Sequence, residues 1–413
     1  MKVLALGAGA VGTVSALKFA KEAVLEKLVI ADTVSARASH LADRLNDPRV
    51  SAITLDAGDR AAVAQAIRQT GTTLVLNAAL PATNLDVMRA CLDAGCDYID
   101  LASAGTDADG IPKMDDQFAL DAEFKAAGRL AILGMGADPG TTNVYAAYAA
   151  KHLLDVVTEL RVRDGDNSIC QGHDGFVASF SPWVMIDECL CKAVSYRGGR
   201  FHLEEPLSGL EQFDFPELGV LNCYYVDHEE SKTLPRFFPS ARTIDFKLCM
   251  DDMTVETLRV MKRLGLSSKT RVRVGDLSVV PRDLVVSLLP QPKDLAGRMR
   301  GKTCVGTLVK GFKNGEPRAY YIYNVSDHEA VYRSLGVQAT AYQTGIPPVI
   351  AARLTAEGVW RGTGVMSPEQ FDPDPFLEAL SRAGMPWQVR DDTVRVETPR
   401  VITRTSRETV AAA

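Results

Sequence analysis

The feature that most constrains the fold is a glycine-rich segment near the N-terminus, GAGAVG at residues 7–12, which follows an apolar run at residues 3–6. Gly7 permits a tight turn after a strand, Gly9 lets the backbone approach a pyrophosphate, and Gly12 lets the next helix pack closely on the strand. Residues 28–32 predict a second buried strand that ends in Asp32, at the spacing where a carboxylate binds ribose hydroxyls. This order predicts a dinucleotide-binding fold with the pyrophosphate at a helix N-terminus.

The acid at the end of the second strand bears on which dinucleotide binds. A carboxylate at Asp32 would repel a 2′-phosphate, so NAD is favoured over NADP. Arg37 keeps NADP possible, because its guanidinium could pair with that phosphate if it folds over the loop. The expected cofactor-binding residues are Gly7, Gly9, Ala10, Val11, Gly12, Asp32, Thr33, Arg37, Asn77, Ala78, Ala79, Pro81, Asn84 and Ser103.

Length and composition fit a soluble enzyme and are sufficient for two domains. The chain has 413 residues, of which 46% are hydrophobic and 24% charged, enough for two sizeable cores. The net charge of −6 comes from interspersed acids and bases and favours neither a nucleic-acid nor a membrane surface. No apolar run reaches the roughly 18 residues of a membrane span, and a strand rather than a signal peptide begins the chain, so a cytoplasmic location is expected. The eight cysteines lack metal-finger spacing, so no metal site is predicted.

The first 137 residues alternate strand and helix patterns and predict a doubly wound parallel sheet. Ligands of such sheets bind at the carboxyl ends of the strands. The loops at Asp32 and at residues 77–84, 101–103 and 134–143 are therefore the places to expect a site. The expected strands are 3–6, 28–32, 51–55, 73–79, 98–101 and 130–133, and the expected helices begin near 10 and span 35–45, 60–69, 84–94 and 115–126.

The pattern changes after about residue 153, where several strands alternate in polarity. They predict an α+β domain with a mostly antiparallel sheet, assigned to residues 138–343 and expected to hold the substrate. Asn314-Gly315 predicts a two-residue hairpin turn between two of its strands. Helices at 349–357 and 375–383, within 344–389, should pack back on the dinucleotide-binding domain, and 390–413 should form a polar tail. The expected strands are 158–163, 221–226, 242–248, 303–312 and 318–325.

Several distinctive motifs are spread along the chain. They are the glycine loop, NAALPATN at 77–84, MRAC at 88–91, GADPGTTN at 136–143, FDFP at 213–216, HEE at 228–230, DHE at 327–329 and FDPDPF at 371–376. Together they resemble the saccharopine dehydrogenase-like oxidoreductases, over nearly the whole chain. The segment from residue 303 onward looks most like carboxynorspermidine-type and saccharopine-type members. Residues 163–167 depart from the pattern of the polyamine enzymes, and 180–205 look closer to lysine-handling relatives, so both substrate classes remain open.

The resemblance implies hydride transfer between a nicotinamide and a carbon bonded to an amine nitrogen. The expected reaction is the reduction of an imine between an amino compound and a carbonyl compound to a secondary amine, or its reverse, with an amino acid or polyamine-type substrate. A lysine 6-dehydrogenase and a non-catalytic NAD-binding sensor are the alternatives. A homodimer is also expected.

Imine chemistry needs proton transfer near neutral pH, for which histidine is suited. His228, next to Glu229 in a family landmark, is the leading catalytic candidate, and Asp138 and Glu229 are the others. Arginine suits a substrate carboxylate because its planar fork binds both oxygens. The expected substrate-binding residues are Asp138, Pro139, Thr142, Asn143, Asp164, Arg197 and Arg236, with Glu188, Arg200 and His328 as further possibilities.

Overall fold

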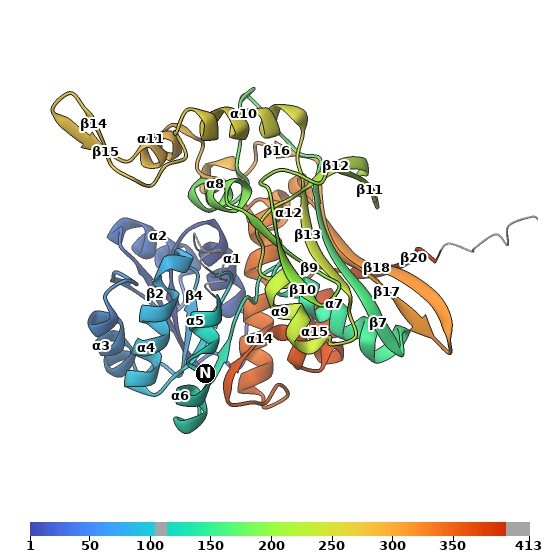
Figure 1. Ribbon diagram of the computed structural model, residues 1–413. Helices are drawn as coiled ribbons and strands as arrows, with labels where there is room; N and C mark the ends of the chain where they lie inside the picture. Colours follow the sequence, from blue (N-terminus) through green and yellow to red (C-terminus); the bar gives the residue numbers. More distant parts are fainter. Residues whose placement is uncertain (104–113, 394–413) are drawn as a thin grey trace, which may run out of the picture.

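The computed structural model describes residues 1–103 and 114–393, which are built around two large sheets (Figure 1). The first sheet has seven strands in the order β19-β6-β5-β4-β1-β2-β3, and all its pairings are parallel. Parallel neighbours require crossover connections, which here are mostly helices. The strands are β1 (Lys2–Leu6), β2 (Lys27–Asp32), β3 (Val50–Thr54), β4 (Leu74–Asn77), β5 (Asp97–Asp100), β6 (Leu130–Ile132) and β19 (Gly364–Met366), and the helices include α1 (Ala10–Phe19), α2 (Ser35–Leu45), α3 (Arg60–Thr70) and α4 (Asn84–Ala94).

This confirms the predicted doubly wound fold, with two local differences. The acidic helix expected at 115–126 is interrupted at Ala119 and Leu120 and forms α5 (Met114–Phe118) and α6 (Asp121–Ala126). The sequence interpretation also missed β19, a three-residue strand that pairs with β6. A strand this short has too few residues for its alternation of side chains to be recognised.

The second sheet has nine strands and is mixed. Its main path runs β10-β9-β13-β7-β17-β18-β20, with β11 and β12 attached through β13. Only the β13–β7 pairing is parallel, so the expectation of a mostly antiparallel sheet is confirmed. The strands are β7 (Val156–Asp166), β9 (Ala193–Arg197), β10 (Arg200–Glu204), β11 (Glu211–Phe215), β12 (Gly219–Tyr225), β13 (Thr243–Cys249), β17 (Lys302–Lys313), β18 (Glu316–Asp327) and β20 (Trp387–Asp391).

Two features of this sheet bear on the sequence-based expectations. Asn314 and Gly315 have φ angles of 52° and 80° and join β17 to β18 as a tight hairpin, as predicted. Arg390 and Asp391, expected in a polar tail, instead belong to β20 and pair with β18. The remainder of that tail, 394–413, lies outside the described residues.

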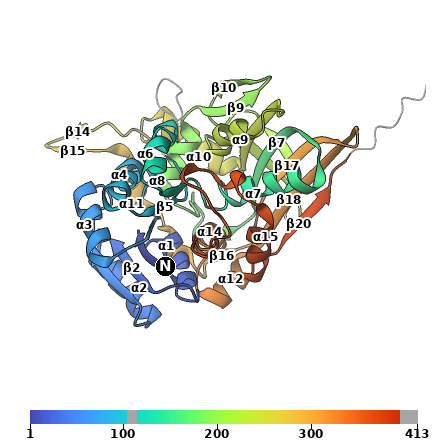
Figure 2. The same cartoon turned by 90° about the horizontal axis from the view of Figure 1, so that it is seen from below.

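The second domain carries its helices at two ends of the sheet (Figures 1 and 2). The small hairpin of β14 (Val272–Val274) and β15 (Leu277–Val279) projects outward next to α11 (Pro281–Leu288). The helical elements are α7 (Thr141–Tyr148), α8 (Pro182–Leu190), α9 (Glu230–Phe237), α10 (Asp252–Arg263), α11 (Pro281–Leu288), η3 (Pro292–Leu295) and α12 (His328–Leu335).

The chain then returns to the first domain through α13 (Ala339–Gly345) and α14 (Pro347–Ala356). Gly345 allows α13 to lie close to α1, because a Cβ there would be 2.7 Å from the Cβ of Val14. Ser15 Oγ also donates a hydrogen bond to the Gly345 carbonyl at 2.9 Å. The second expected helix, α15 (Pro373–Arg382), packs on α7 and α14, and the carbonyl of Ala383 at its C-terminal end accepts a hydrogen bond from Lys18 Nζ of α1 at 3.1 Å. One hydrophobic core therefore runs through both domains.

Two further properties of the described residues are the hydropathy of the helices and the state of the cysteines. In the described part of the chain, none of the helices combines the length and the hydropathy needed to span a membrane. All eight cysteines are free thiols, and five of them are fully buried.

Candidate functional site

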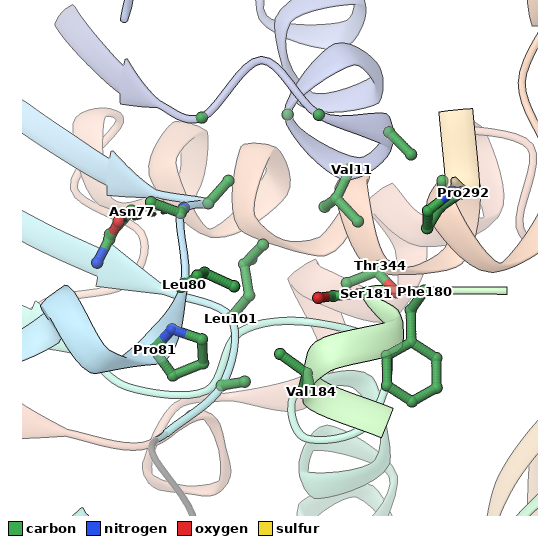
Figure 3. Close-up of a pocket in the computed structure, with 18 of the residues that line it drawn as sticks. Val11, Asn77, Leu80, Pro81, Leu101, Phe180, Ser181, Val184, Pro292 and Thr344 are labelled. Carbon is green, nitrogen blue, oxygen red and sulfur yellow. Dashed lines mark hydrogen bonds between the residues drawn. The ribbon is translucent and has the colours of Figure 1, made fainter. Parts of the chain in front are cut away.

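A cavity of about 570 Å³ lies between the two domains, at the carboxyl ends of β1, β2 and β4 (Figure 3). Figure 3 shows Val11 on one side of it and Phe180, Ser181 and Val184 on another. Most of the predicted cofactor residues meet here. They are Gly7, Gly9, Ala10, Val11, Gly12, Asp32, Thr33, Arg37, Asn77, Ala78, Ala79, Pro81 and Asn84.

The glycine loop has the shape that a pyrophosphate requires. A Cβ on Gly12 would lie 1.9 Å from the Gly7 carbonyl oxygen, and a Cβ on Gly7 would lie 2.6 Å from the Ala78 carbonyl oxygen, so both positions pack backbone against backbone. A Cβ on Gly9 would meet nothing within 4 Å and would occupy the open cavity. The first turn of α1 has no acidic residue, and Gly9 supplies no side-chain cap. These N–H groups therefore fit an anion in the cavity.

Asp32 has backbone partners in addition to its position at the cavity. Its Oδ2 accepts a hydrogen bond from Ala8 N at 2.9 Å, and its Oδ1 accepts one from Val34 N at 2.8 Å. Arg37 is half exposed, and its Nη1 lies 3.9 Å from Asp32 Oδ1. The carboxylate thus braces the glycine loop, a role that the spacing in the sequence does not reveal. Ribose binding by Asp32 stays a prediction.

Asn77 and Asn84 also hold the loops that line the cavity. Asn77 Nδ2 donates to Asn84 Oδ1 at 2.9 Å, and Asn84 Nδ2 donates to the Ala102 carbonyl at 2.8 Å. Figure 3 shows the Asn77 amide directed away from Val11 and Thr344. The two amides therefore fix the turn that presents Pro81 to the cavity.

The opposite end of the cavity belongs to the second domain and is acidic. Asp138 follows β6, Asp164 lies in β7, and Glu188 lies in α8 four residues after Val184, so both face the cavity from one side of that helix. His228 comes just after β12. The lysine and arginine side chains among the described lining residues are Lys293 and Arg37, and neither lies in the segments that carry Asp138, Asp164, Glu188 and His228.

His228 is held from two sides. Its ring stacks on Phe246 with centroids 3.7 Å apart and an interplanar angle of 7°. Its Nδ1 is 2.5 Å from Glu230 Oε2 and 3.6 Å from Glu229 Oε2. Because Nδ1 is engaged with Glu230, Nε2 is the ring nitrogen that could exchange a proton with a ligand.

Burial and charge shift the proton affinities at this end of the cavity. Burial raises the pKa of Glu188 to about 8 and that of Asp164 to about 7. Burial, followed by the charge of Asp164, raises the pKa of Asp138 well above its usual range, and the two carboxyls hydrogen-bond to each other. Burial lowers the pKa of His228, but the charges of Glu230 and Glu229 outweigh it and raise that pKa well above its usual value. The site therefore holds exchangeable protons near neutral pH, and a bound cation would favour the ionised carboxylates.

Thr142, Asn143 and Glu229 lie behind this end of the cavity rather than in its lining. Thr142 Oγ1 donates to Glu230 Oε1 at 2.8 Å, and Asn143 Nδ2 donates to Glu369 Oε2 at 2.9 Å. Glu229 accepts a hydrogen bond from the backbone of Ser103, which is buried and likewise absent from the lining. Asp138, Pro139 and Asp164 do line the cavity. Each of these predicted segments thus reaches the cavity region, but some of its residues lie behind the lining, and their roles stay predictions.

The two predicted arginines lie elsewhere. Arg197 pairs with Glu204 on the β9–β10 hairpin, and Arg236 pairs with Asp115 and stacks over the Phe118 ring at 4.5 Å. Neither lines the cavity, and their role in binding a substrate stays a prediction. Each pairs with an acid that the sequence does not identify as its partner.

Other lining residues were not anticipated. They come from remote segments that fold over the dinucleotide-binding domain, and none lies in a motif that indicates binding. These residues include Phe180, Ser181, Val184, Gln291, Pro292, Lys293, Thr340 and Thr344.

Comparisons with known proteins agree with this geometry. Residues 3–132 match the family model "Saccharopine dehydrogenase NADP binding domain", and residues 136–385 match "Saccharopine dehydrogenase C-terminal domain". The chain is 33% identical to carboxyaminopropylagmatine dehydrogenase of Synechocystis sp., over 94% of this chain and 96% of that protein. It is 34% identical to carboxynorspermidine synthase of Vibrio cholerae, over 95% and 97% respectively.

Solved structures show the same fold at low sequence identity. Apo saccharopine dehydrogenase (L-Glu forming) from Saccharomyces cerevisiae has a TM-score of 0.71 and 15% identity, covering 95% of this chain and 100% of that one. Homospermidine synthase from Legionella pneumophila in complex with NAD has a TM-score of 0.66 and 15% identity, covering 98% and 95%.

Proposed function

The chain belongs to the saccharopine dehydrogenase family, and we propose that it reduces an imine formed between a polyamine-type amine and a carbonyl compound to a secondary amine. It is an NAD(P)-dependent oxidoreductase acting on CH–NH groups. The acidic end of the cavity is the observation that favours a polyamine-type amine as the substrate. Asp138, Asp164 and Glu188 offer carboxyls to an amine, and the named full-length relatives make or oxidise carboxylated polyamines.

The residues at the cavity fall into two groups: those that would hold the cofactor, and those that bind the amine and protonate the imine nitrogen. The glycine loop and the N-terminus of α1 would hold the dinucleotide, which supplies a hydride when bound. Asp138, Asp164 and Glu188 bind and orient the cationic amine. Forming the imine releases water, and reducing it takes up one hydride and one proton. His228 Nε2 donates that proton to the substrate nitrogen, while Glu230 holds the ring through Nδ1.

The decisive experiment is a panel of amines and carbonyl compounds assayed by loss of nicotinamide absorbance. We expect turnover only when a diamine or guanidino-amine and an aldehyde are both present. Turnover of an amino aldehyde with ammonia alone would instead indicate the lysine 6-dehydrogenase chemistry. Tight NADH binding without turnover on any pair would indicate a sensor. Either result would overturn the proposed reaction.

We further propose a preference for NADH over NADPH, which Asp32 supports. Asp32→Ala should weaken NADH binding by about 10- to 150-fold, because one charge-assisted hydrogen bond is worth roughly 1.5–3 kcal/mol. It should also discriminate less against NADPH. Fluorescence titration of both dinucleotides measures these effects.

Because the Asp32 carboxylate also accepts hydrogen bonds from two backbone N–H groups, a matched variant has to separate that structural role from cofactor binding. Asp32→Asn keeps an oxygen for Ala8 N or Val34 N, so it should relax discrimination with a smaller change in unfolding temperature. A parent enzyme that already prefers NADPH would contradict the proposal and assign the 2′-phosphate to Arg37.

The homodimer and the cytoplasmic location also remain proposals. The β14–β15 hairpin supports association, because Val274 and Leu277 are 58% and 68% exposed. The eight free cysteines are compatible with a reducing compartment.

A further inference from the structure

A lysine of the second domain lines the same cavity as the glycine loop. Lys293 lies in η3, more than 270 residues after the loop, and both contribute to the cavity wall. Figure 3 labels the neighbouring Pro292 and Val11 of α1 among the lining residues of this cavity. The segment that carries Lys293 and the N-terminal end of α1 therefore line one cavity from different domains.

The backbone that presents this lysine is well anchored. Leu295, two residues later, is fully buried. Gln291 Nε2 donates to the carbonyls of Val286 and Leu289, both at 3.1 Å. The ring of Pro292, the next residue, restricts that proline's own φ angle. The short turn is thus held in place, while the Lys293 side chain stays accessible.

Only a weak attraction to the neighbouring Asp294 holds the Lys293 ammonium in its present position. Lys293 Nζ is 2.6 Å from Asp294 Oδ1, and both side chains are 53% exposed. An exposed pair of adjacent residues contributes little to stability. Lys293 can therefore turn toward an anion in the cavity at small cost.

The anion that fits is the phosphate part of the cofactor. Gly9 faces open space, the first turn of α1 carries no acid, and Arg37 is already close to Asp32 at the ribose end. A second cation on the far side would complete the surroundings of a pyrophosphate. We propose that Lys293 binds the cofactor pyrophosphate from the second domain, so that the dinucleotide bridges the two domains. This inference needs the dinucleotide site but not the imine chemistry.

Lys293→Gln tests the proposal by binding alone, since it removes the charge and nearly keeps the length. We expect about tenfold weaker binding of NADH, NADPH and ADP-ribose alike, as for loss of one charge-assisted contact. Adenosine, measured by competition with NADH, should bind as it does to the parent. Lys293→Arg should bind NADH within about threefold of the parent. Calorimetric titration measures each affinity.

Two variants serve as matched controls. Lys302→Gln removes an exposed lysine that pairs with Glu217 away from the cavity, and should change no affinity. Arg37→Gln should weaken NADPH more than NADH, unlike Lys293→Gln. The unfolding temperature of each variant without ligand verifies the fold.

Parental affinity of Lys293→Gln for NADH and ADP-ribose would overturn the inference. If the KM for the carbonyl substrate were also raised in that variant, Lys293 would be assigned to a substrate carboxylate instead. Failure of the imine reaction in the substrate panel would leave the binding result intact, so the two proposals fail separately.

Discussion

His228→Ala should lower kcat by about 10²–10⁴-fold, the usual effect of removing a positioned acid or base. His228 lines the cavity, is held by Glu230 at 2.5 Å and stacks on Phe246, so its ring is fixed where a substrate nitrogen would lie. NADH affinity should change little, because His228 lies at the acidic end of the cavity, opposite the glycine loop. Steady-state kinetics and a fluorescence titration of NADH measure the two effects.

The pH profile gives a readout that a purely structural role would not. The charges of Glu230 and Glu229 raise the pKa of His228, which favours the charged imidazole, so activity should fall as the pH rises through that pKa. His228→Gln fills similar space without titrating, and should lose this alkaline limb along with the rate. A loss below tenfold in both variants would make His228 structural and favour Asp138, which also lines the cavity. A folded variant that no longer binds NADH would contradict the assignment of His228 to the substrate end of the cavity.

Gly9→Val should weaken NADH binding by about 100-fold or more, because it would remove at least one charge-assisted phosphate contact and fill the space next to it. Gly9 has a φ of −76°, which L-residues readily adopt, and a Cβ there would meet nothing within 4 Å. The valine should therefore leave the fold intact and occupy the cavity. Fluorescence titration and the unfolding temperature test these two statements separately.

Neighbouring positions supply the comparison. Gly9→Ala adds one methyl group and should have a smaller effect. Gly12→Ala places a Cβ 1.9 Å from the Gly7 carbonyl oxygen, so it should damage the loop and lower the unfolding temperature as well. Parental NADH affinity in Gly9→Val would show that the pyrophosphate does not approach this residue.

The dinucleotide-binding half of the protein was predictable because its signals are local. The glycine loop, the acid at Asp32 and the apolar strands each express a constraint within a few residues, and a parallel sheet brings the carboxyl ends of its strands to one edge. The hairpin at Asn314 was predictable for the same reason, since its turn requires positive φ angles. His228 and Asp138 were found from motifs that resemble a family.

What only the tertiary structure decided is which side chains reach the cavity. Thr142 and Asn143 carry suitable groups, but the packing of α7 against α9 and Glu369 turns them into supports. Arg197 and Arg236 are bound by acids that the sequence does not place beside them. Glu188 and Lys293 reach the cavity only because α8 and η3 fold over the first domain. Sequence patterns report the constraints of local backbone and burial, whereas the partners of a charged side chain depend on how the fold brings strands and helices together, across seven residues for Arg197 and Glu204 and 121 residues for Arg236 and Asp115.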